Sequence, residues 1–93
     1  MKYADELIYS ANVLKALGNP KRLQVVYFLY DGEKNVGALE KMLGISQSAL
    51  SQHLSVLRAA DIVSTRREAQ SVYYSLNKGR NKKLLDAIRK VYA

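Results

Sequence analysis

The feature that most constrains the fold is an apolar stripe in residues 46–58 whose opposite face is polar. At about 100° per residue, Leu50, Leu54 and Leu57 fall on one side of a helix. Gly44 ends a short preceding helix over residues 36–43. Two helices joined by a tight glycine turn predict a helix-turn-helix. The outer face of the second helix carries hydroxyl and amide side chains and a cation, at Ser48, Ser51, Gln52, Ser55 and Arg58.

Short hydroxyl and amide groups approach a surface closely and both donate and accept hydrogen bonds. The same composition is also common on helices that contact only water, so the rest of the chain has to distinguish the two interpretations. Charge favours a polyanionic partner, because the net charge is +7. Residues 58–93 hold nine basic and three acidic groups, whereas residues 1–57 hold six and five. Such a surface suits phosphates, although basic charge also aids solubility.

Composition excludes several functions. The chain has no cysteine, which excludes disulfides, thiolate metal sites and cysteine nucleophiles, and a single histidine cannot build a histidine-rich metal site. No Gly-rich phosphate loop or nucleophile–base pair is visible, so we expect neither an enzyme nor a cofactor. No apolar run approaches the ~20 residues of a membrane span, and no signal peptide is visible. We therefore expect one domain over residues 1–93 in the cytosol.

The order of patterns along the chain predicts a mainly α (α+β) fold, in the order α-α-α-α-β-β-α. Apolar residues recur at helical spacing over residues 4–17, about 20–31, 36–43 and about 47–60. They recur again in a separate last helix that runs to about residue 92. Asn19 is the expected cap of the second helix, and Asn77 or Asn81 that of the last. Residues 31–35 read as a turn. β-Branched and aromatic residues predict strands over 62–67 and 71–76, so the expected architecture is five helices with a two-stranded hairpin, a winged helix.

The two terminal helices carry more apolar surface than a small winged helix needs. We infer that they pack against a second copy to give a two-fold dimer, which would set two recognition helices about 34 Å apart on DNA. The alternative is that they only cap their own core. The residues predicted for the interface are Leu7, Ala11, Leu14, Leu84, Leu85, Ile88, Val91 and Tyr92.

Three segments resemble the ArsR/SmtB family of bacterial winged-helix repressors. They are LGNPKRL at 17–23, VGAL at 36–39 and ISQSALSQHLSVLR at 45–58. The continuation VSTRREAQSVYYSL at 63–76 is similar to the HlyU, NolR and BigR branch. The resemblance implies a homodimer that binds an imperfect inverted repeat in double-stranded DNA, as a repressor or anti-repressor. It also implies a bacterial or archaeal cytosol, with the protein associated with the nucleoid. The alternative function is a winged-helix module that binds protein, or binds nucleic acid without specificity.

The resemblance also implies which residues meet DNA. The recognition helix would enter the major groove and the wing, residues 66–71, would reach the backbone or minor groove. His53 is expected to brace the helix or touch a phosphate rather than bind metal, and Lys21 and Arg22 can equally be ordinary solvated charges. The full set of predicted contacts is Ser46, Gln47, Ser48, Ser51, Gln52, His53, Arg58, Arg66, Arg67, Lys21 and Arg22.

The chain departs from the family at the sensor positions. Metal-sensing members carry cysteine ahead of the recognition helix, or His and carboxylate ligands on the last helix, where this chain offers only Asp86. Thiol-sensing members of the branch hold cysteines near the positions of Tyr27 and Ala93 here. Neither switch is therefore expected, and a small-molecule or protein effector is left open.

Overall fold

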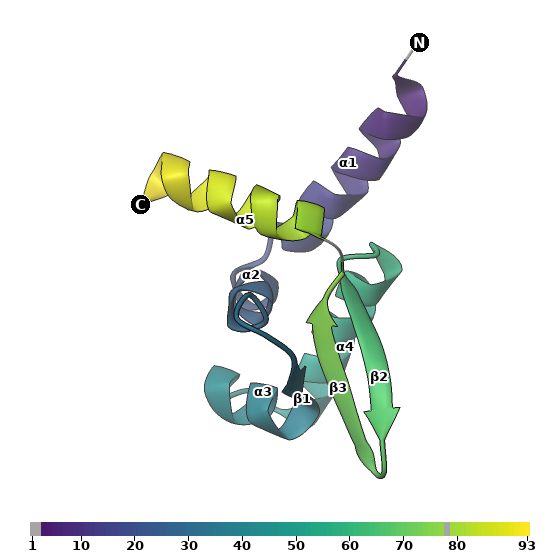
Figure 1. Ribbon diagram of the computed structural model, residues 1–93, viewed down its shortest axis with the longest axis vertical. Helices are drawn as coiled ribbons and strands as arrows, with labels where there is room; N and C mark the ends of the chain where they lie inside the picture. Colours follow the sequence, from purple (N-terminus) through teal and green to yellow (C-terminus); the bar gives the residue numbers. More distant parts are fainter. Residues whose placement is uncertain (1–2, 78) are drawn as a thin grey trace.

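The computed structural model describes residues 3–77 and 79–93, which form five helices and one antiparallel sheet (Figure 1). The first four helices and the strand between them precede a hairpin and a last helix. Their bounds are α1 (Ala4–Leu17), α2 (Pro20–Phe28), β1 (Lys34–Asn35), α3 (Val36–Leu43), α4 (Gln47–Ala59), β2 (Val63–Glu68), β3 (Ser71–Leu76) and α5 (Gly79–Tyr92). The predicted winged helix-turn-helix is confirmed. Within the described residues, no helix is long and apolar enough to cross a membrane.

The helix-turn-helix forms as its local signals predict. Gly44 has φ +65°, in the left-handed region, and ends α3. The hydroxyl of Ser46 caps α4 by accepting the backbone N–H of Ala49 at 3.1 Å. The stripe of α4 faces inward, and the core that it joins consists mainly of leucines and valines from all five helices and the start of the hairpin. The polar face of α4 therefore points outward.

The sheet differs from the prediction by one strand. Two residues expected in a turn, Lys34 and Asn35, form β1 and pair with Tyr74 and Tyr73, so the strand order is β1-β3-β2. Residue propensities could not predict β1, because the strand is too short to show a pattern and depends on a partner far along the chain. The second predicted strand has the expected bounds, β2 is displaced by one residue, and α2 ends at Phe28, earlier than expected.

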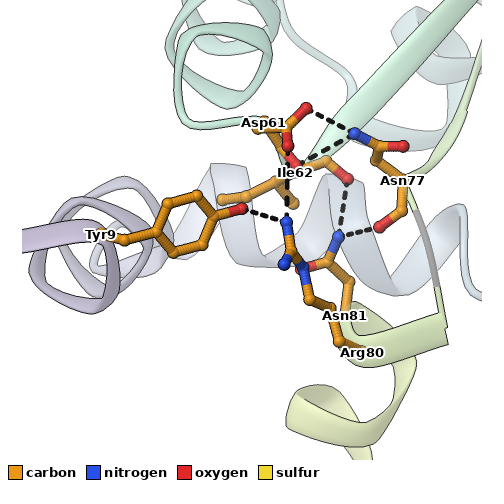
Figure 2. A network of polar contacts seen from close by, with 6 residues as sticks. All are labelled: Tyr9, Asp61, Ile62, Asn77, Arg80 and Asn81. Carbon is orange, nitrogen blue, oxygen red and sulfur yellow. Dashed lines mark hydrogen bonds and ion pairs between the residues drawn. The ribbon is translucent and has the colours of Figure 1, made fainter. Parts of the chain in front are cut away.

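A polar network joins the base of the hairpin to both terminal helices (Figure 2). Asp61, with φ +60°, follows α4, and its Oδ1 accepts the Asn77 side-chain amide at 2.5 Å. The guanidinium of Arg80 reaches both Asp61, at 3.5 Å, and the hydroxyl of Tyr9 on α1. Asn81 lies inside α5 and donates to the carbonyl of Ile62 at 3.3 Å. The prediction that Asn81 caps the last helix is thus wrong, because Asn81 lies within α5 and its side-chain amide donates to the residue that precedes β2.

Helices α1 and α5 lie at the opposite end of the molecule from the wing tip (Figure 1). Leu7, Leu14, Val91 and Tyr92 expose 50%, 59%, 70% and 85% of their surface, and Ala11 is also exposed. Leu84 and Ile88 are half-buried. Assigning Leu85 to an interface was wrong, because its side chain is 2% exposed and belongs to the core of its own chain.

The turn between α3 and α4 generates a prediction about stability. In Gly44→Ala nothing lies within 4 Å of the added Cβ, so the cost is backbone strain alone. We expect about 1–2 kcal/mol of lost stability, or a melting temperature lower by roughly 4–8 °C per kcal/mol. Gly79→Ala is the control, since its Cβ also meets nothing within 4 Å and no left-handed φ is involved. Circular dichroism at one protein concentration measures both variants, and equal melting temperatures would refute the turn argument.

Candidate nucleic-acid interface

The exposed face of α4 is a surface of hydrogen-bonding groups that have no partner in the part of the chain that the structure describes. The side chains of Gln47, Ser48, Ser51 and Gln52 are exposed, and within residues 3–77 and 79–93 none of them forms a hydrogen bond. The helix sequence QSALSQHLSVLRA contains no carboxylate. Amide and hydroxyl groups in this state match the donor and acceptor pattern of base edges in a major groove.

Four further predicted contacts lie on α2 and α4, and the structure separates them into two kinds. Lys21 and Arg58 are exposed. Arg22 instead turns into the protein, where its Nε donates to the carbonyl of Ala16 at 2.6 Å and its Nη1 lies 3.5 Å from Nδ1 of His53. His53 is half-buried. This geometry supports the bracing interpretation of His53, because the Arg22 guanidinium links the end of α1 to the middle of α4.

The two wing arginines have different surroundings. Arg66 donates from Nε to the carboxylate oxygens of Glu33 at 3.1 and 2.9 Å, and from Nη1 to Glu68 at 2.7 Å. Arg67 is exposed, and it forms no ion pair or hydrogen bond with any residue that the structure describes. Sequence reasoning did not find Glu33, because a carboxylate 33 positions away from its partner gives no local signal.

The ion pair acts on the acidity of Glu33. Hydrogen bonds from Arg66 stabilise the charged carboxylate and hold the pKa of Glu33 below its usual value of 4.5, against a smaller opposing effect of desolvation. The same carboxylates raise the pKa of Arg66. Near neutral pH Glu33 and Arg66 are therefore both charged. Among the described residues there is no cluster of three or more side chains that could hold a metal ion.

A protein-family model described as "Bacterial regulatory protein, arsR family" matches residues 19–65. These residues run from the cap of α2 through the helix-turn-helix into β2, so the match covers the polar face of α4. The segments that carried the family resemblance lie largely within it.

Individual relatives agree with the family match. The chain is 51% identical to the nodulation protein NolR of Rhizobium meliloti over 91 residues, which are 98% of this chain and 74% of NolR. It is 45% identical to the transcriptional activator HlyU of Vibrio cholerae over 80 residues, 86% of this chain and 74% of HlyU. A solved structure of a homodimeric winged helix-turn-helix DNA-binding domain from Mycobacterium bovis superimposes with a TM-score of 0.89. The two sequences are 31% identical, and the superposition covers 96% of this chain and 82% of that one.

The Glu33–Arg66 pair generates a prediction about titration. In Arg66→Ala we expect the pKa of Glu33 to rise toward 4.5, because the charged carboxylate loses its hydrogen bonds. The stabilisation from this pair is present above pH 4.5 and is lost as pH falls through the lowered pKa of the folded protein. Carbon-detected NMR titration of the glutamate carboxyls measures the shift. Arg67→Ala is the control, and an equal rise in that variant would mean that the effect is not the ion pair.

Proposed function

Since the chain belongs to the arsR family of bacterial regulatory proteins, we propose that it recognises an inverted-repeat operator in double-stranded DNA as a homodimer. Members of the family are transcriptional regulators, not enzymes. The observation that carries the proposal is the outer face of α4, where exposed amide and hydroxyl groups have no partner among the described residues. In the proposed complex this face lies in the major groove, as expected for the second helix of a helix-turn-helix.

The chemistry of α4 supports reading of base edges. The amides of Gln47 and Gln52 can each pair with the N6 and N7 atoms of adenine in two parallel hydrogen bonds. Ser48 and Ser51 can contact either a base edge or a phosphate. A protein-binding helix would more often present bulky apolar groups here, and a duplex of RNA would not admit the helix, because its major groove is too narrow.

In this proposal, affinity for the DNA backbone comes from exposed cationic side chains. Lys21 on α2, Arg58 on α4 and Arg67 on the wing are exposed. Each phosphate that they neutralise releases condensed counterions and makes binding weaken with salt. The net charge of +7 points the same way. This electrostatic attraction brings the protein to DNA in the bacterial cytosol without sequence preference, and α4 then supplies the preference.

The homodimer is proposed from the exposed apolar side chains of the terminal helices. Leu7, Ile8 and Leu14 on α1, with Val91 and Tyr92 on α5, leave apolar surface in water on both helices. Several large apolar side chains exposed on one helix are typical of an interaction site. The related domain from Mycobacterium bovis is described as homodimeric, which supports a second copy as the occupant.

Gln52→Ala tests base reading. Selection from a randomised duplex library supplies the preferred operator, and fluorescence anisotropy compares it with a scrambled duplex at ~150 mM salt. We expect the wild type to prefer the operator at least ~10³-fold, and Gln52→Ala to lose about 1–3 kcal/mol on the operator alone. Gln24→Ala, an exposed glutamine on α2, is the control. Weak and equal wild-type binding to both duplexes would favour a non-specific nucleic-acid or protein-binding module instead.

Leu14→Glu tests the dimer. A charge at this exposed position would lie in the proposed interface, where it has no partner, so we expect a monomer at micromolar concentration. Sedimentation equilibrium measures the mass, and Met42→Glu on α3, also an exposed apolar position, is the control. A dimer that persists in Leu14→Glu with an unchanged dissociation constant would place the interface elsewhere.

A further inference from the structure

The two wing arginines are neighbours in the sequence but lie on opposite faces of β2, because side chains alternate along a strand. The antiparallel register places Arg66 across from Tyr73 and Arg67 across from Val72. On its own face the Arg66 guanidinium covers the ring of Tyr73, 4.5 Å from the ring centroid. Stacking of this kind holds the planar cation against the sheet.

The charge around Arg66 is already more than balanced. Its guanidinium pairs with the carboxylates of both Glu33 and Glu68, so the three side chains together carry a net charge of −1. A phosphate that approached Arg66 would meet two carboxylates at hydrogen-bond distance from the same donors. Like charges in contact disfavour a phosphate there. Arg66 is therefore poorly suited to the phosphate contact that its place at the wing suggested.

The bond between Arg66 and Glu33 crosses the whole sheet. Arg66 lies on β2, β3 is the central strand, and Glu33 directly precedes β1 at the other edge. β1 leads without a break into α3, whose N-terminus is capped by Asn35 through the N–H of Ala38 at 2.8 Å. Figure 1 shows β1 between α3 and the hairpin. Arg66 thus ties the outer strand of the wing to the start of the helix-turn-helix.

We propose that Arg66 is a positioning residue that fixes the wing against the helix-turn-helix through Glu33, and that Arg67 is the wing's phosphate ligand. This inference rests on the proposed binding to DNA. Pairs that are this exposed contribute modestly one by one, but two carboxylates and a tyrosine ring act on one guanidinium. Without them the outer end of the hairpin is held only by strand pairing, and ordering a more mobile end on DNA costs binding free energy.

Arg67 has the opposite properties. It lies on the other face of β2 from the carboxylates of Glu33 and Glu68, since it alternates with Arg66. Its guanidinium is exposed, and no ion pair joins it to any described residue. A cation in this state gains the full release of counterions when it meets a phosphate.

A double-mutant cycle on operator affinity tests the assignment, using Arg66→Ala, Glu33→Ala and both together. If Arg66 works through Glu33, we expect Arg66→Ala to weaken operator binding about fivefold in the wild-type background. In the Glu33→Ala background the same change should cost less than about twofold, because the brace is already broken. The cycle cancels the general effect of adding or removing one charge near DNA.

Salt dependence separates a phosphate ligand from a positioning residue. Arg67→Ala should reduce the slope of log affinity against log salt by about 0.9, whereas Arg66→Ala should change it by well under half of that. A full reduction in Arg66→Ala, or a larger cost of Arg66→Ala once Glu33 is removed, would show that Arg66 binds phosphate itself and overturn the inference. Absence of any preferred operator for the wild type would instead refute the proposed function, before the variants are compared.

Discussion

The surface that this protein offers to DNA depends on the burial of one face of α4. Leu50 and Leu57 are fully buried and Leu54 is 2% exposed. Each such side chain contributes about 1.5–3 kcal/mol when removed from water, so rotating α4 about its axis would be costly. The amides and hydroxyls on the opposite face consequently have to point outward, whatever they bind. Gly44 sets the turn by which α4 follows α3, and Ser46 sets the residue at which α4 begins.

The wing and the terminal helices meet at the residues that follow α4 and β3. Asp61 leaves α4 with a left-handed backbone, which a non-glycine residue adopts only at a cost. Its carboxylate is held by Asn77 from the other end of the hairpin and by Arg80 from α5 (Figure 2). Arg80 in turn reaches Tyr9 on α1. The base of the wing and both terminal helices are therefore fixed to one another by side chains from four separate parts of the chain.

Most of the fold follows from signals within a few residues of one another, and the sequence predicted those parts. Helical spacing, the cap at Ser46 and the glycine turn are of this kind, and so is the hairpin. The strand β1 and the pairing of Arg66 with Glu33 depend on partners more than thirty positions away, which no local pattern encodes. Leu85 shows a different limit. Helical periodicity identifies an apolar face, but an interior and an interface are both apolar, so only the packing placed Leu85 in the core.

Two tyrosine hydroxyls hold α5 against the rest of the protein by hydrogen bonds. The hydroxyl of Tyr27 donates to the backbone carbonyl of Leu85 at 3.0 Å, and that of Tyr30 donates to Asp86 at 2.6 Å. The bond to Asp86 raises the pKa of Tyr30, so the Tyr30 hydroxyl stays protonated near neutral pH and this bond persists. The bond from Tyr27 joins α2 to α5, and the bond from Tyr30 joins α5 to the residues that follow α2, so together they hold α5 against this part of the chain.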